Sequence, residues 1–110
     1  MEPVLLTEEQ IEEKRKSIEG RLGVPVSAFC FMADGKQIVG FTKEAPRITK
    51  MRAFDRMLIS ITDACDILLT AMLIAEESSP EIIKDDKAYM SALLQVQGVL
   101  NPYSNTLKKN

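Results

Sequence analysis

The longest hydrophobic pattern in the chain runs from Ile48 to Glu77. Apolar residues recur there at alternating steps of three and four, which places them on one stripe of an α-helix: Met51, Phe54, Leu58, Ile61, Cys65, Leu68, Met72 and Ala75. Between Ile67 and Ala75 only Thr70 is polar, so this half is expected to be the central core helix. Thr62 or Asp63 could cap a fresh helix start, but the unbroken stripe favours one continuous or slightly kinked helix.

Two shorter segments, Pro25–Ala33 and Lys36–Thr42, are rich in β-branched and aromatic residues. Asp34-Gly35 between them is typical of a two-residue type I′ turn, which needs positive φ at both positions. This turn predicts a hairpin register in which the following residues are paired: Ala33 with Lys36, Phe31 with Ile38, Cys30 with Val39, Phe29 with Gly40 and Ala28 with Phe41. Both faces carry apolar residues, so we expect the hairpin to lie on helices or to pair with strands of a partner.

Thr7-Glu8-Glu9-Gln10 has the form of a capping box, with Leu6 and Ile11 placed as a hydrophobic staple. It predicts a helix from Glu8 to about Arg21, ended by the glycines at 20 and 23. The apolar positions of this helix are sparse, so it is expected to be peripheral or to dock on a neighbour. Ile18 is accordingly expected to matter less to the core than Leu68.

The C-terminal part predicts one further helix. Ser79-Pro80 could start a single turn, and a longer helix begins at Asp85 or Asp86, whose acids fit an N-cap better than a metal pair. Its apolar stripe and the residues beside it are Tyr89, Leu93, Val96, Leu100, Ala92 and Val99. Asn101-Pro102 is expected to end this helix.

Together these elements predict an α+β fold, in which a two-stranded antiparallel hairpin packs beside a small bundle of three to four helices. A length of 110 residues corresponds to a single domain. Within it we expect a peripheral helix or arm at 1–23, the hairpin and helical core at 24–102, and a polar tail at 103–110 that is ordered only by contact with something else.

The composition argues against reaction chemistry. The chain has no histidine, which removes the usual general base and the commonest metal ligand. Cys30 and Cys65 lack CxxC spacing and are expected to be buried small hydrophobes, with a disulfide or redox role as the alternative. No enzymatic activity, metal or cofactor is therefore expected.

The sequence also bears on cellular location. Residues 1–6 lack the positive charge and apolar run of a signal peptide, and 67–75 is far shorter than the roughly 20 residues that span a bilayer. We expect no membrane partner, and unpaired cysteines fit a reducing cytosol.

Basic residues gather at the start of the long predicted helix, where cations oppose the helix macrodipole. Between Lys36 and Arg56 the local charge balance is +4, although the whole chain carries only −2. Stability alone would not place cations here, so a ligand for them is one explanation. The candidate partner-binding residues are Lys43, Arg47, Lys50, Arg52 and Arg56.

An anionic protein surface, nucleic acid or the acidic end of a second copy could bind this basic block. The alternative without function is a solvated face paired with the acids of 8–13, since surface charge pairs contribute little. A small nucleic-acid-binding accessory protein using residues 43–56 ranks second to protein binding. The reason is that stacking aromatic residues are limited to Phe41 and Phe54, and Phe54 belongs to the core stripe.

An acidic block follows the basic one, with a charge balance of −6 between Asp63 and Asp86. Copies arranged head to tail would join these opposite charges. An unpaired edge of the hairpin is a second adhesive element. A homo-oligomer is therefore expected.

The order of these features resembles that of small proteins of tailed bacteriophages similar to tail-assembly chaperones and minor virion proteins. The features are the capped helix, the hairpin around Asp34-Gly35, Pro46-Arg47, the long helix, the acidic Glu76-Glu77 loop, Asp85-Asp86, a Tyr-bearing helix and a Lys-Lys tail. The tryptophan and glycine usual near that acidic loop are replaced here by Met72-Leu73-Ile74-Ala75-Glu76. The resemblance implies a protein without catalytic residues that binds other phage structural or assembly proteins, in the virion or the host cytoplasm.

Overall fold

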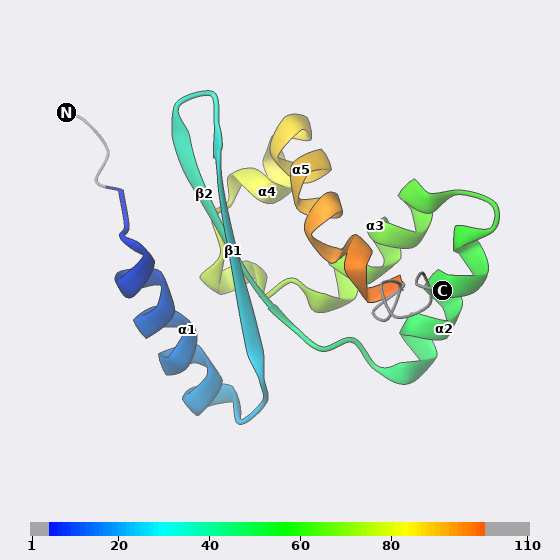
Figure 1. Cartoon of the computed structure of the whole chain (residues 1–110), viewed down its shortest axis with the longest axis horizontal. Coiled ribbons are helices and arrows are strands. Elements are labelled where there is room, and N and C mark those ends of the chain that lie inside the picture. Colours follow the sequence, from blue (N-terminus) through cyan, green and yellow to red (C-terminus); the bar gives the residue numbers. More distant parts are fainter. Residues whose placement is uncertain (1–4, 101–110) are drawn as a thin grey trace, which may run out of the picture.

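The computed structural model describes residues 5–100 (Figure 1). The elements in chain order are α1 (Glu8–Leu22), β1 (Val26–Ala33), β2 (Lys36–Lys43), α2 (Arg47–Met57), α3 (Ile61–Met72), the 3₁₀ turn η1 (Ala75–Glu77), α4 (Glu81–Lys84), α5 (Asp86–Val96) and the 3₁₀ turn η2 (Gln97–Leu100). The predicted α+β arrangement of an antiparallel hairpin beside helices is confirmed. The expected helix end at Asn101-Pro102 and the tail 103–110 lie outside the described residues.

The hairpin has the predicted register at every pair from Val26–Lys43 to Ala33–Lys36. Asp34 and Gly35 both have positive φ, 52° and 79°, as a type I′ turn requires. The observed register is therefore the one that the Asp34-Gly35 turn predicts.

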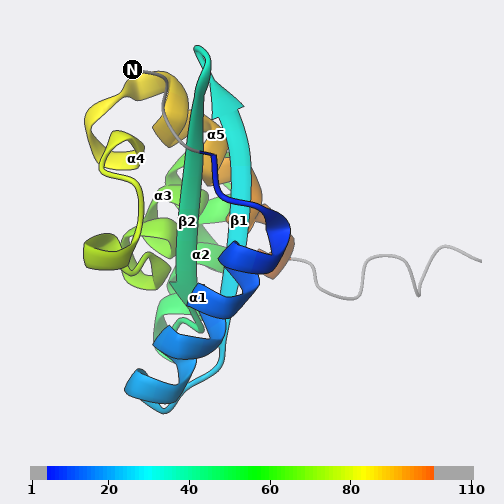
Figure 2. The same cartoon turned by 90° about the vertical axis from the view of Figure 1, so that its left-hand side faces the viewer.

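The hairpin is the middle layer of the molecule, with α1 on one face and α3 and α5 on the other (Figures 1 and 2). On the α1 side, Val39 and Phe41 of β2 are buried in one cluster with Ile18. On the opposite side, Ile38 joins the main core with residues of α3 and α5. Helices therefore cover both apolar faces of β2, as the first of the two expectations for the hairpin proposed.

The outer edge of β2 is closed by the segment around η1. The N–H groups of Val39 and Phe41 donate to Ser79 Oγ (2.9 Å) and Ser78 Oγ (3.0 Å). Their carbonyls accept from the N–H groups of Ser79 and Ile74, each at 2.8 Å. The segment after α3 thus stands in for a third strand on this edge.

Helix α1 begins as predicted, with a complete capping box between Thr7 and Gln10 and a left-handed Gly23 at its end. The low weight given to Ile18 is at odds with its burial, since its side chain is 1% exposed and that of Leu68 is 0% exposed. Ile18 packs with Val26, Val39 and Phe41, and Arg15 and Glu19 bond to the backbone of Val26, so both apolar and polar contacts attach α1 to the hairpin.

The single helix predicted across 48–77 is wrong, because the chain reverses after α2. Helix α3 starts at Ile61 with Ser60 as its N-cap, whose hydroxyl accepts from Asp63 N–H at 3.1 Å. The cap is therefore neither Thr62 nor Asp63. A continuous helix of that length would extend about 45 Å, whereas the reversal lets α2 bury Ala53 in the same core as Cys65.

The predicted apolar stripe is consequently buried in its second half, apart from Ala75, and exposed in its first. In α3, the predicted core residues Cys65, Leu68 and Met72 are buried. Four other residues of the predicted stripe are exposed: Met51, Phe54, Leu58 and Ile61. Ala75 in η1, the last residue of the stripe, is exposed as well. The alternation of three and four steps identified the helical period correctly, but it could not reveal the turn between two helices.

The two cysteines also differ from the prediction. Both are free, and Cys65 is buried as expected, with burial raising the pKa of its thiol. Cys30 is exposed, although its cross-strand neighbour Val39 on β2 is buried. Burial was therefore predicted correctly for one cysteine of the two.

The C-terminal helix matches the prediction where it is described. Asp85 caps α5 by accepting from Ala88 N–H at 3.1 Å, so its role is that of an N-cap. Leu93, Val96 and Leu100 are buried on the expected stripe, and α5 passes into η2 after Val96. No helix among residues 5–100 has the length and apolar character needed to cross a membrane.

Candidate partner-binding surface on helix α2

Helix α2 is oriented with its small residue inward and its large apolar residues outward. Ala53 is fully buried in the core. On the other side of the helix, Ile48 is 65%, Met51 57%, Phe54 50% and Leu58 79% exposed. Steps of three and four residues place these four side chains along one face. This is the reverse of an ordinary surface helix.

The exposed face continues through the turn into the start of α3, where Ile59 is 74% and Ile61 43% exposed. We call this set of residues the α2 apolar surface: Ile48, Met51, Phe54, Leu58, Ile59 and Ile61. Scattered apolar residues on a surface are ordinary, whereas a contiguous row along one helix is a candidate interaction site.

Two hollows border this surface. One, of about 360 Å³, lies between α2 and η2 and is lined by Lys50, Met51, Phe54, Val99 and Leu100. The other is an open depression lined by Arg52, Asp55, Arg56, Ile59 and Ile67. Apolar and basic side chains are therefore combined on both flanks of the helix.

Four of the predicted basic residues lie on α2 and Lys43 ends β2, with Arg52 and Arg56 lining one hollow and Lys50 the other. Two of the five are already paired. Lys50 Nζ lies 2.5 Å from Glu44 Oε2, and Arg56 Nη2 lies 3.0 Å from Asp63 Oδ2. The hydrogen bond from Lys50 lowers the pKa of the Glu44 carboxyl. Within residues 5–100, Lys43, Arg47 and Arg52 have no ion-pair partner.

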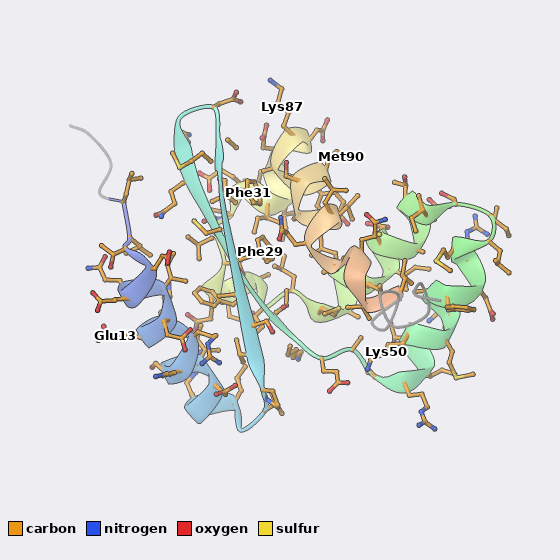
Figure 3. All side chains as sticks on the ribbon, in the orientation of Figure 1. Glu13, Phe29, Phe31, Lys50, Lys87 and Met90 are labelled. Carbon is orange, nitrogen blue, oxygen red and sulfur yellow. The ribbon has the colours of Figure 1, made fainter. Side chains whose placement is uncertain are left out.

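The alternative that the basic block pairs with the acids of the first helix is not what the structure shows. Glu12 pairs with Arg15 of its own helix at 2.6 Å. Glu13 on α1 and Lys50 on α2 lie on opposite sides of the molecule, with the hairpin between them (Figure 3). The partners of the paired cations come from the neighbouring loop and from α3 instead.

The first turn of α2 has no compensating negative charge. Pro46 occupies the N-cap and makes no side-chain cap, and the turn contains no acidic residue. The helix dipole leaves partial positive charge at this end, to which Arg47 adds. An anionic or polar group on a partner would be favoured here.

The expected separation of basic and acidic blocks at opposite ends of one helix is wrong. The reversal at 58–60 places Asp63 beside Arg56, so the two blocks meet at one end of the helix pair. Glu77 is also engaged, by Arg21 of α1. The charge blocks are therefore not at opposite ends of one helix, as the expected head-to-tail association of copies requires.

Within residues 5–100 no cluster of three or more Asp, Glu, Cys or His side chains is placed to hold a metal ion. The exposed side chains of α2 include apolar groups, arginine guanidinium groups and the Lys50 ammonium group. Such groups form apolar contacts and ion pairs with a partner.

Sequence reasoning found the basic residues of this surface but not the exposure of its apolar ones. The signal that could have revealed this exposure is Ala53, a small residue on the side of α2 opposite the large apolar ones. A small residue allows two helices to pack closely, and Ala53 lies on the side on which α2 packs against α3. Comparison of the chain with protein-family models, with curated proteins and with solved structures gave no match.

Proposed function

We propose that this chain is an assembly or virion component of a bacteriophage, acting through contacts with other phage proteins, and that the α2 apolar surface is its principal contact. The observation that carries the proposal is the outward orientation of Met51, Phe54 and Leu58 on a helix that buries only Ala53. Covering apolar surface is favourable by about 25 cal/mol per Å². These side chains gain that free energy only when a partner covers them.

The composition of the surface indicates what the partner offers. Aromatic residues, Met and Arg are enriched in protein interfaces, and this surface combines Phe54 and Met51 with Arg52. The partner is expected to present an apolar groove for the row of α2 side chains. Acidic groups at the rim would face Lys43, Arg47 and Arg52, which have no ion pair within the described residues.

The phage context is supported by the resemblance in layout to tail-assembly chaperones and minor virion proteins. It implies a location in the virion or the host cytoplasm. The neighbouring genes test this part of the proposal: a portal, capsid or tape-measure gene beside this one is expected. A neighbourhood of metabolic genes would contradict the phage context while leaving the contact surface open to test.

A photo-cross-linking amino acid at position 58 tests the surface directly. Leu58, directly after α2, is 79% exposed, and Leu94, 68% exposed on α5, is the matched control. In phage-infected cells, the probe at 58 should form an adduct with one phage structural protein, identified by mass spectrometry. Equal adducts at 58 and 94, or none at 58, would contradict a partner at α2.

The alternative function, binding of nucleic acid, is favoured by one observation. Lys43, Arg47 and Arg52 remain without ion pairs among the described residues, and such cations bind phosphates. The double variant Arg47→Glu/Arg52→Glu should then abolish DNA binding measured by fluorescence anisotropy at low salt. If the wild type binds DNA through these arginines and position 58 captures no protein, the alternative replaces the first proposal.

A further inference from the structure

The outer edge of β1 carries backbone groups without hydrogen-bond partners among residues 5–100. In an antiparallel pair, alternate residues direct their N–H and C=O groups toward and away from the neighbouring strand. Val39 and Phe41 direct theirs away from β1, since these groups bond to the segment 74–79. Their cross-strand partners Cys30 and Ala28 must therefore direct theirs outward as well.

The same alternation makes Met32 and Val26 the next outward residues. Val26 is already satisfied: its N–H donates to Glu19 Oε2 and its carbonyl accepts from Arg15 Nη1, each at 2.9 Å. Beyond Met32 the strand ends at the turn. The free β1 edge thus consists of Ala28, Cys30 and Met32.

This edge lacks the features by which proteins protect exposed strands. Natural edge strands carry charges, prolines or bulges that prevent pairing with other chains. The eight residues of β1, Val-Ser-Ala-Phe-Cys-Phe-Met-Ala, include no charge and no proline, and the register has no bulge. Ala28 and Cys30 are exposed and Met32 is 56% exposed. In Figure 2 the edge lies on the side of β1 away from β2.

We propose that a second copy of this chain binds at the free β1 edge, with the two β1 strands antiparallel about a two-fold axis at Cys30. The product is a continuous four-stranded sheet, with both α1 helices on one face and the remaining helices on the other. Isologous contacts of this kind are the commonest way in which identical chains associate.

The free backbone groups select this register. With Cys30 opposite Cys30, Ala28 pairs with Met32 of the second copy, and every free N–H and C=O finds a partner. A shift by one pair in one direction would place Met32 opposite Val26, whose groups are occupied by Glu19 and Arg15. A shift in the other direction would place Ala28 opposite the turn residue Asp34.

The side chains fit the same register. On the α1 face, the small Ala28 lies opposite the large Met32. On the other face, Phe29 lies opposite Phe31 of the second copy, beside the stacked Phe29–Phe31 pair already present, whose ring centroids are 6.0 Å apart (Figure 3). Aromatic cross-strand pairs stabilise sheets, and an uncharged strand meets no like charge when it pairs with itself.

Oxidation with diamide tests the contact, because the two thiols then form one disulfide while diamide takes up the two electrons and two protons. Directly paired residues have Cα atoms about 5.5 Å apart, within the range of disulfides. Wild type and Cys65→Ser should give a covalent dimer on a non-reducing gel, and Cys30→Ser should not. Absence of a Cys30-linked dimer at concentrations where the protein associates would overturn the proposal.

The register has its own test in the Cys30→Ser background. Chains carrying Ala28→Cys and chains carrying Met32→Cys, mixed and oxidised, should cross-link to each other far more than either does alone. Equal cross-linking of Ala28→Cys chains with themselves would show another register and overturn the two-fold axis at Cys30.

The non-covalent dimer is measured by sedimentation equilibrium under reducing conditions. Cys30→Lys, which places two ammonium groups opposite each other, should be monomeric where the wild type is dimeric. Leu58→Lys, in the α2 apolar surface, should leave the dimer intact, which separates this contact from the proposed partner surface. A wild type that stays monomeric, or a dimer lost in Leu58→Lys but kept in Cys30→Lys, would contradict the proposal.

Discussion

Gly40 shows how one residue fixes the contact between two strands. Its cross-strand neighbour is Phe29, and a Cβ added at position 40 would lie 2.1 Å from the ring carbon Cζ. No side chain fits beneath the ring, so the aromatic residue rests directly on the backbone of β2. The register derived from the turn paired these two residues, but the sequence could not show that the ring folds over the glycine.

Gly40→Ala should therefore destabilise the protein by about 1–3 kcal/mol, the usual cost of overpacking. The loss arises because the methyl group displaces the Phe29 ring. In a Phe29→Leu background the same substitution should cost clearly less, so that the two changes are non-additive in urea unfolding. Equal costs in both backgrounds would show that the ring does not limit this position.

Tyr89 is expected to make the free energy of unfolding depend on pH in the alkaline range. Burial, and then the hydrogen bond that its hydroxyl donates to Asp66, raise the pKa of this phenol above its ordinary value of 10.0. A raised pKa means that the folded state favours the neutral phenol. Its contribution is full below the unfolded pKa and is lost as pH rises through the folded pKa.

The difference in free energy of unfolding between wild type and Tyr89→Phe should accordingly be full well below pH 10 and shrink as the pH rises past about 10 and through the raised folded-state pKa. Chemical unfolding at several pH values measures it, and titration of lysines common to both proteins cancels in the difference. A difference that grows with pH would mean that Tyr89 ionises more easily in the folded state.

At the scale of whole elements, sequence reasoning succeeded where the determining signals are local. The capping box at Thr7, the Asp34-Gly35 turn and the Asp85 cap each specify a boundary within a few residues, and all three are confirmed. Sequence reasoning failed at residues 58–60, where the chain reverses between α2 and α3. No glycine or proline marks this reversal, and the helical period of apolar residues continues across it. The reversal allows Ala53 of α2 to pack in the same core as α3. This is a tertiary contact, which a local sequence pattern does not show.

Ser60 is the residue that starts α3, and its removal should be costly. Ser60→Ala should lower the free energy of unfolding by about 0.5–2 kcal/mol, because Asp63 N–H loses the acceptor that caps the helix. Thr62→Ala is the matched control, since Thr62 is exposed within the first turn of α3. Urea melts should show a larger loss at position 60. The opposite order would place the cap at the residue first suggested by the sequence.

At the scale of the molecule, the candidate surface was predicted only in part. Four of the five cations lie on α2 and Lys43 ends β2, as their positions in the sequence require. The apolar row beside them was assigned to the core, because periodicity identifies a face of a helix without saying what covers it. Only the three-dimensional arrangement separates an apolar face that is buried from one that is exposed.

The layered architecture also predicts where stability lies. Ile18→Ala and Leu68→Ala should each cost about 2–5 kcal/mol, since both side chains are at most 1% exposed. Leu22→Ala, at a 40% exposed position of α1, serves as the control and should cost much less. Thermal or urea unfolding measures all three. A small loss at Ile18 would mean that α1 adds little to the fold.

The position of α1 outside the hairpin has a consequence for native-state dynamics. Its apolar contacts form a separate cluster around Ile18 and Phe41, distinct from the core shared by α3 and α5. Such a unit can detach while the rest stays folded, as independently opening segments do in hydrogen exchange. Amide protons of α1 should then exchange with deuterium sooner than those of α3, and each opening would briefly expose Val39 and Phe41 to water.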